Sequence, residues 1–143
     1  MHNTTDNKYK IIDSLFKKIV TTKKAQFSKK LYLSKNEIVS MYKNGMYFGC
    51  HGTSHLRLNE ISEKKMKFEI NNNIKFLKSM GVFNKYWIMC YPHGSYNKVT
   101  LNYLTKKNCF LGLTTQSGFE NINKFHRLKI KRIDCNEVDS ILN

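Results

Sequence analysis

The chain has 143 residues, of which 41% are hydrophobic and 13% are aromatic. This composition fits one folded domain of ordinary size and excludes a wholly disordered chain, while a single proline and seven glycines exclude a collagen-like or proline-rich chain. No apolar run approaches the ~20 residues that a transmembrane helix needs, and residues 1–10 lack the apolar core of a signal peptide. We therefore predict a cytoplasmic protein without a transmembrane segment.

The formal charge is strongly positive, at +15, from 25 lysines and arginines against 10 acidic residues. Lysine supplies 22 of these 25 positive charges. Proteins dedicated to binding nucleic acid more often use arginine, whose forked guanidinium group contacts phosphate and guanine. The charge therefore predicts a solvated, lysine-rich surface and no nucleic-acid partner, and a basic nucleic-acid-binding module ranks third among the functions considered.

The first part of the chain, residues 1–30, is predicted to be a helical segment. Apolar side chains recur three and four positions apart over residues 8–19, which is typical of an amphipathic helix, and a lysine-rich stretch follows. Ser34 and Glu37 have the spacing of a capping box, which predicts a second helix through about residue 44. Gly45 then stands where a helix often ends.

The rest of the chain alternates between short apolar runs and longer helical patterns. The predicted strands are residues 46–50, 86–91, 109–114 and 128–133. The predicted helices between them are residues 62–80, with one apolar face, and residues 97–108, capped by Asn97. This alternation predicts an α/β fold with parallel strands, in which the loops that leave the carboxyl ends of the strands build the active site.

The four cysteines are widely separated and form no Cys-x-x-Cys pair, which argues against a thiolate zinc site. Three of them lie in or at the end of apolar segments. With no export signal in the sequence, we interpret the cysteines as buried free thiols.

Two histidines, His51 and His55, follow directly after the first predicted strand. If their loop is helical or tightly turned, both imidazoles point the same way and can bind one divalent metal. The spacing alone is weak evidence, because a pair of surface histidines can have it by chance. The position after a buried strand makes the functional interpretation about as well supported as a chance pair of surface histidines.

A second candidate loop, with the sequence Tyr91, Pro92, His93 and Gly94, follows the second predicted strand. Proline and glycine make a turn rigid and can leave a backbone N–H free to point into a pocket. Such an N–H can stabilise an oxyanion. Taken by itself, this segment is better explained as an ordinary surface turn.

Both loops resemble motifs of one family. Residues 45–58, Gly-Met-Tyr-Phe-Gly-Cys-His-Gly-Thr-Ser-His-Leu-Arg-Leu, look like the second motif of polysaccharide deacetylases of the NodB-homology type, in carbohydrate esterase family 4. Residues 90–97, Cys-Tyr-Pro-His-Gly-Ser-Tyr-Asn, look like the third motif. The resemblance runs from about residue 31 to residue 134, and two motifs in order make it fairly specific.

This resemblance implies a distorted (β/α) barrel that hydrolyses N- or O-acetyl groups on polysaccharides or sugars. It implies that His51 and His55 hold a divalent metal, with zinc expected first and cobalt, manganese, iron or nickel as alternatives. It implies catalytic roles for Tyr91 and His93, with the His93 backbone N–H at the oxyanion. Residues 91–94 would shape the wall of the substrate groove.

The sequence also departs from the family. The first motif, Thr-Phe-Asp-Asp-Gly, which supplies the third metal ligand and the general base, is absent from the sequence before His51. We therefore expect the first strands of the barrel to be missing, with residues 31–143 as the later part of a deacetylase domain. Asp134, at the end of the last predicted strand, is the residue that could replace the missing carboxylate. His93 itself replaces the usual aromatic residue of the third motif.

The leading prediction is a metal-dependent deacetylase acting on acetylated carbohydrate, in a truncated form with little activity on its own. The alternative is a non-catalytic remnant that binds carbohydrate or a protein partner. A complementing N-terminal half or a second copy of the chain would be the expected protein partner. The sequence does not identify the sugar, its linkage or the preference for N- or O-acetyl groups.

Overall fold

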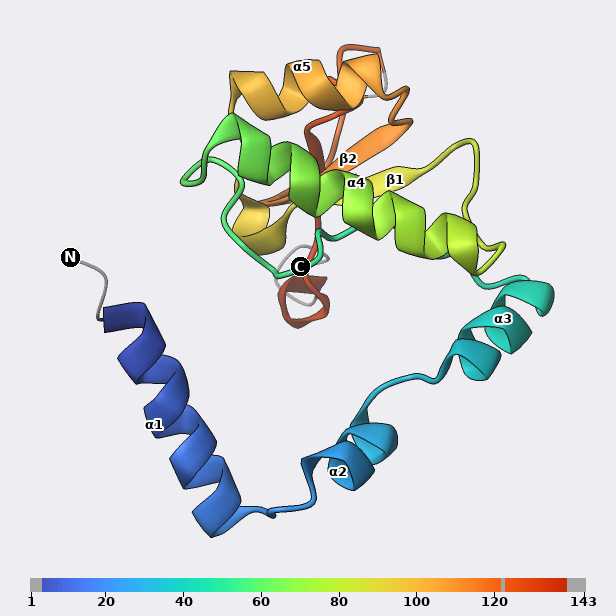
Figure 1. The fold of residues 1–143 in the computed structure, drawn as a ribbon. Coiled ribbons are helices and arrows are strands. Elements are labelled where there is room, and N and C mark those ends of the chain that lie inside the picture. Colours follow the sequence, from blue (N-terminus) through green and yellow to red (C-terminus); the bar gives the residue numbers. More distant parts are fainter. Residues whose placement is uncertain (1–3, 122, 139–143) are drawn as a thin grey trace. The chain divides into compact units, whose positions relative to one another are not determined.

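The computed structural model describes residues 4–121 and 123–138. The chain divides into two units, Met1–Ser40 and Met41–Asn143, and each is described by itself. Figure 1 shows the order of the elements along the chain. Within the described residues, the structure contains no helix with the length and apolar character that crossing a membrane requires.

The N-terminal unit consists of helices. Helix α1 (Thr4–Ile19) agrees with the predicted amphipathic helix, and the lysine-rich stretch after it forms a further helix, α2 (Lys24–Leu31). Phe16 of α1 and Phe27 of α2 meet edge to face, with ring centroids 5.5 Å apart. This contact explains how a short, highly charged stretch becomes helical, since packing supplies stability that a short isolated helix lacks.

Helix α3 (Lys35–Lys43) begins at the predicted capping box. The Glu37 backbone N–H donates to the Ser34 hydroxyl at 3.2 Å, and the Ser34 N–H donates to the Glu37 carboxylate at 2.6 Å. These two bonds satisfy backbone groups that a helix N-terminus otherwise leaves without partners.

A parallel sheet forms the centre of the C-terminal unit. Its strands are β1 (Ile88–Cys90), β2 (Leu111–Ser117) and β3 (Ile130–Arg132), in that spatial order, with every pair parallel. The predicted α/β class with parallel strands is confirmed. Strands β1 and β3 are shorter than the predicted strands 86–91 and 128–133. Strand β2 begins and ends later in the chain than the predicted strand 109–114.

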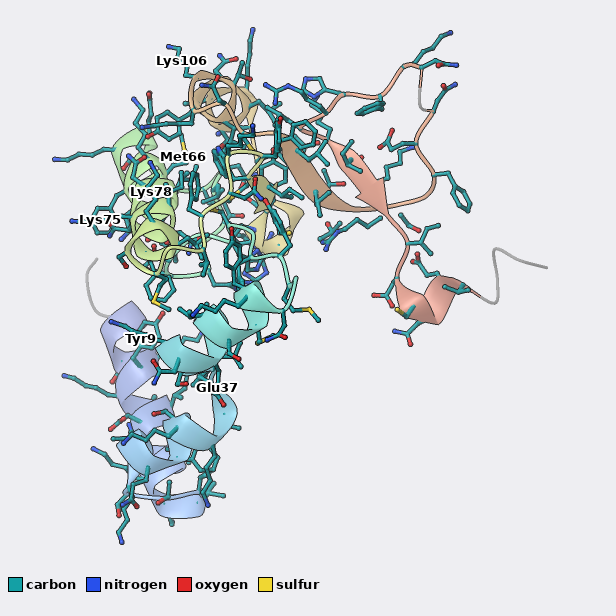
Figure 2. The ribbon with its side chains drawn as sticks, turned by 90° about the vertical axis from the view of Figure 1, so that its right-hand side faces the viewer. Tyr9, Glu37, Met66, Lys75, Lys78 and Lys106 are labelled. Atoms are coloured by element: carbon teal, nitrogen blue, oxygen red, sulfur yellow. The ribbon has the colours of Figure 1, made fainter. Side chains whose placement is uncertain are left out.

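Helix α4 (Glu63–Ser79) precedes β1, helix α5 (Lys98–Lys106) connects β1 to β2, and both helices begin at polar caps. The Ser62 hydroxyl accepts from the Lys65 N–H, and the Asn97 side chain accepts from the Thr100 N–H, as the sequence predicted for Asn97. Figure 1 shows α4 and α5 beside the sheet. In Figure 2 the side chains of α4 spread to different sides, and the exposed Lys75 contrasts with the buried Met66.

The predicted strand at residues 46–50 is wrong except at its last residue. Only Cys50 pairs with the sheet, in an isolated parallel bridge to Met89. The Cys50 N–H donates to the Ile88 carbonyl, and the Cys90 N–H donates to the Cys50 carbonyl, each at 2.8 Å. Met46 and Tyr47 are 55% and 44% exposed, so the apolar run is not a buried strand but a connection that reaches the sheet at Cys50.

The core of this unit is apolar and includes two of the four cysteines. Its buried hydrophobic residues are Cys50, Leu58, Met66, Ile70, Leu77, Val82, Trp87, Met89, Tyr91, Leu104, Cys109 and Leu128. All four cysteines are free thiols, but Cys90 is only partly buried and Cys135 is exposed. Burial, with a smaller contribution from neighbouring cysteines, raises the pKa of Cys50 to about 12, so this thiol stays protonated at neutral pH.

Candidate functional site

The two candidate loops meet at the carboxyl end of β1. The ring centroids of His51 and His55 are 4.8 Å apart, with the ring planes inclined by 56°. The ring of His93, from the loop after β1, lies 4.5 Å from that of His55. The structure thus brings together three histidines from two segments that the sequence placed on one edge of the sheet. The roles assigned to them by resemblance remain predictions.

His51 is held at both its backbone and its ring. Its N–H donates to the Asn73 side-chain oxygen of α4 at 2.9 Å, and its ring Nδ1 lies 2.8 Å from the Cys90 carbonyl oxygen. A carbonyl oxygen can only accept, so Nδ1 carries a proton in this hydrogen bond, and the neutral tautomer that makes this bond has its lone pair on Nε2. A backbone carbonyl on the far nitrogen is the usual outer partner of a metal-ligating histidine.

The loop between the two histidines is fastened to α4 by Glu69. This side chain is fully buried, and its Oε2 accepts from the N–H groups of Thr53 at 2.9 Å and Ser54 at 2.6 Å. The Thr53 hydroxyl donates to the Glu69 backbone carbonyl at 3.0 Å. The Lys65 ammonium lies 3.2 Å from Oε1, which has no other polar partner among the described residues.

These contacts set the ionisation of Glu69. Burial would raise the pKa of its carboxyl group, but the hydrogen bonds from Ser54, Lys65 and Thr53 favour the charged form and outweigh burial. The pKa of Glu69 therefore lies below its usual value, and the carboxylate is charged at neutral pH.

The second loop contains a short 3-10 helix, Pro92–Gly94, that rests on the core. Tyr91 is 1% exposed, and its hydroxyl donates to the Leu128 carbonyl at 2.8 Å. The structure therefore places Tyr91 beneath the loop, with its hydroxyl already engaged. A Cβ on Gly94 would overlap the Thr115 side chain of β2, so the loop lies tightly against the next strand.

His93 is the exposed part of this loop. Its φ of 56° lies in the left-handed region, which is uncommon for residues other than glycine. Within residues 4–121 and 123–138, neither its backbone N–H nor its ring has a hydrogen-bond partner. The N–H predicted to face an oxyanion is thus without a partner among these residues, and it belongs to the residue whose ring contacts His55.

Asp134 is engaged by a neighbouring side chain and backbone group. Its carboxylate accepts from the backbone N–H and the side-chain amide of Asn136, both at 2.9 Å, at the start of the 3-10 helix η2 (Cys135–Glu137). Asp134 also lines a polar cavity of about 270 Å³ with Thr115, Ser117, Arg132, Ile133 and Glu137. In the part of the chain that the structure describes, no three His, Cys, Asp or Glu side chains are arranged to hold a metal ion.

Sequence reasoning missed Glu69 and Asn73, which hold the histidine loop. A signal for them is present in α4, because Met66, Ile70 and Leu77 form its buried apolar face. Positions 69 and 73 fall on the same face by helical periodicity. A carboxylate on a buried face requires polar partners, so its position predicts a bound loop.

The sequence matches the family described as polysaccharide deacetylase over residues 6–109. This chain belongs to the polysaccharide deacetylase family. The matched range begins within α1 and includes both histidine loops. Members of this family are hydrolases, and they generally depend on a metal. A comparison with curated proteins found no match.

A solved structure supports the assignment of this deacetylase domain. The chain resembles the Streptococcus pyogenes deacetylase PplD, solved in complex with acetate, with a TM-score of 0.64 and 28% sequence identity. The similarity covers 71% of this chain and 44% of that chain. The chain therefore has the fold of part of a deacetylase of the NodB type, as predicted, and spans less than half the length of that relative.

Proposed function

We propose that this domain hydrolyses acetyl groups on carbohydrate with the help of a divalent metal held by His51 and His55. The observation that carries the proposal is the paired imidazoles at the carboxyl end of β1, 4.8 Å apart between centroids. The hydrogen bond between Nδ1 of His51 and the Cys90 carbonyl supports it, because it leaves Nε2 free to bind. Imidazole ligands suit zinc first, with cobalt, manganese, iron and nickel as alternatives.

The chain's own residues would divide the remaining work. When bound, the metal would polarise the acetyl carbonyl and lower the pKa of a bound water. The free N–H of His93 would donate a hydrogen bond to the oxygen that becomes negative during the reaction. Tyr91 would support this loop from below through its bond to Leu128, rather than contact the substrate. The substrate would be an acetylated polysaccharide or sugar, and acetate would be the product.

The general base is the missing part of this site. The Asp-Asp motif of the family is absent from the sequence before His51, and Asp134 is engaged with Asn136. We propose that full activity requires a segment that carries these carboxylates. A non-catalytic domain that binds carbohydrate is the second candidate, and it is favoured because the described residues contain no group of three His, Cys, Asp or Glu side chains arranged to hold a metal ion.

The test is release of acetate from acetylated glucosamine oligomers in the presence of Zn²⁺ or Co²⁺. We expect metal-dependent release, slower than ordinary turnover by about 10²–10⁴-fold, because that is the usual contribution of general acid–base catalysis. His51→Ala should abolish the release, whereas His126→Ala, at an exposed position, should not change it. Oligomer binding without any release would support the non-catalytic alternative. Release that survives both metal removal and His51→Ala would contradict the proposal.

A further inference from the structure

Helices α1 and α2 expose apolar side chains over much of their length. We call residues 4–33, which contain both helices, the basic helix pair. Its exposed apolar side chains, each 50–74% exposed, include Ile12, Leu15, Ile19, Leu31, Tyr32 and Leu33. None of residues 7–40 is buried. A unit of this size rarely encloses a core that is sufficient for stability, so the basic helix pair needs a further apolar environment.

Positive charge is concentrated in the same segment. The basic helix pair contains eight lysines, two aspartates and no arginine. Asp13 pairs with Lys17 of α1 and with Lys24 of α2. Four further lysines form no ion pair with the side chains that the structure describes; they are Lys18, Lys23, Lys29 and Lys30. Their ammonium groups are therefore available to an anionic partner.

Helix α1 separates its apolar and charged side chains. Ile12, Leu15 and Ile19 recur three and four positions apart, so they lie on one face of the helix. Lys10 and Lys17 are seven positions apart and lie on the opposite side. Helix α1 has 16 residues, and no helix among the described residues is long and apolar enough to cross a membrane. A short amphipathic helix of this kind is suited to lie along a membrane surface.

An open apolar cavity between the two helices adds to this surface. It has a volume of about 410 Å³, and Tyr9, Phe16, Lys24 and Tyr32 are among its lining residues. Tyr9, which is labelled in Figure 2, and Tyr32 are 64% and 72% exposed. Tyrosine combines an apolar ring with a polar hydroxyl group and is enriched at the level of lipid head groups. Apolar side chains, tyrosines and a lysine thus meet at one surface.

We propose that the basic helix pair binds an anionic lipid surface. Its apolar face enters the boundary between head groups and acyl chains, and its lysines contact the anionic head groups. The composition favours lipid over an acidic protein, because lysine is depleted in protein interfaces, whereas arginine and tryptophan are enriched there and are both absent from residues 4–33. A nucleic acid would attract the lysines but would leave the apolar face in water. This proposal does not depend on the proposed function.

The test is co-sedimentation of the full chain with lipid vesicles. One set of vesicles contains phosphatidylcholine alone, and the other contains phosphatidylcholine with phosphatidylserine. Lys18→Gln combined with Lys30→Gln tests the charge, and Leu15→Gln combined with Ile19→Gln tests the apolar face. Glutamine is a good helix former, so both variants should keep their helices, which circular dichroism measures.

The matched control removes the same charge from the C-terminal unit. Lys75→Gln combined with Lys98→Gln replaces two exposed lysines of α4 and α5. If net charge alone caused binding, this control would lose as much affinity as the variant of Lys18 and Lys30. The proposal predicts that it binds the vesicles like the unsubstituted chain.

We expect the unsubstituted chain to bind the vesicles with phosphatidylserine, more weakly as salt screens the charges, and to bind phosphatidylcholine alone poorly. The variant of Lys18 and Lys30 should bind roughly 25-fold more weakly, because one lysine near an anionic membrane is worth about fivefold in affinity. The variant of Leu15 and Ile19 should bind at least about tenfold more weakly, because two apolar side chains no longer leave water.

Three outcomes would overturn the proposal. The first is failure of the folded, unsubstituted chain to bind the vesicles with phosphatidylserine. The second is an equal loss of affinity in the control of Lys75 and Lys98, or no loss in the variant of Leu15 and Ile19. The third is a dimer in light scattering that the variant of Leu15 and Ile19 abolishes, without vesicle binding, which would assign the apolar face to a second copy of the chain. None of these measurements involves acetate release, so this proposal and the proposed function can fail separately.

Discussion

Glu69 is the residue whose replacement tests the structure of the histidine loop most directly. Its buried carboxylate accepts hydrogen bonds from the N–H groups of Thr53 and Ser54, and the Lys65 ammonium is 3.2 Å from its other oxygen. Glu69→Gln keeps the shape of the side chain and one acceptor oxygen but removes the charge. The substitution therefore tests the charge on this carboxylate without leaving a cavity.

The expected loss of stability follows from the strength of these bonds. A hydrogen bond to a charged group contributes about 1.5–3 kcal/mol, roughly twice the contribution of a bond between neutral groups. With two backbone donors weakened and an ion pair lost, we expect Glu69→Gln to lower the free energy of unfolding by about 2–3 kcal/mol at pH 7. If the histidines bind metal as proposed, the looser loop should also weaken that binding about 10–100-fold.

Acid should remove the difference in stability between Glu69→Gln and the unsubstituted chain. The pKa of Glu69 is lower in the folded chain than its ordinary value of 4.5, so the unfolded state binds the proton more tightly. The stability that the charge provides is therefore present above pH ~4.5 and is lost as the pH falls through the folded-state pKa. Glutamine does not titrate, so the difference in the free energy of unfolding between Glu69→Gln and the unsubstituted chain should become smaller in this acidic range.

Urea unfolding followed by Trp87 fluorescence, at pH 7 and at steps below pH 4.5, measures both effects. Glu63→Gln is the matched control, because Glu63 lies on the same helix but pairs with Lys67 in solvent. Such exposed pairs contribute about 0–1 kcal/mol, so the control should change little. Equal stability of Glu69→Gln and the unsubstituted chain at pH 7, or a gap that persists undiminished in acid, would refute the reasoning.

Three further substitutions test the parts that carry the loops. Gly112→Ala should lower the free energy of unfolding in urea by about 3 kcal/mol. The added Cβ would lie 2.6 Å from the Leu128 carbonyl oxygen and even closer to the Tyr91 hydroxyl. An unchanged free energy of unfolding would show that the sheet opens more easily than the packing implies. Tyr91→Phe should cost about 1–3 kcal/mol, because the Leu128 carbonyl loses its donor; no measurable loss would mean that water replaces the hydroxyl. Asn97→Ala should cost about 1 kcal/mol, because the Thr100 N–H at the start of α5 loses its cap, and Asn97→Asp should restore most of it.

Local signals in the sequence predicted much of this fold. Ser34 with Glu37, and Asn97 with Thr100, are short-range patterns whose partners lie three residues apart, so the sequence contains both halves of each cap. The predicted strand at residues 46–50 was wrong for the opposite reason. Its strand character depends on a neighbour 39 positions away, and only Cys50 meets that neighbour. Apolar composition alone does not distinguish a paired strand from an exposed connection.

The candidate site also combines features that the local sequence predicts with contacts between distant segments that it does not. The positions of His51, His55 and His93 after apolar segments predicted that they gather at one edge of the sheet, because parallel strands present their carboxyl ends together. The side-chain oxygens of Glu69 and Asn73 contact that loop across about twenty positions of chain, at separations of 15, 16 and 22. The position of Glu69 on the buried face of α4 indicates that it needs polar partners, but only the fold of α4 against the loop shows which groups these are.

The parallel pairing of the strands also determines when the histidines come together during folding. Parallel strands need long connections, and β1 pairs with β2 through residues as far apart as Ile88 and Leu111. Non-local contacts form late, because the chain must close a large loop before it gains any contact energy. We expect the locally capped α4 and α5 to form first and the β1 edge, with the carbonyl of Cys90 that holds His51, to form last. A chain stalled before that step carries all three imidazoles but not their arrangement.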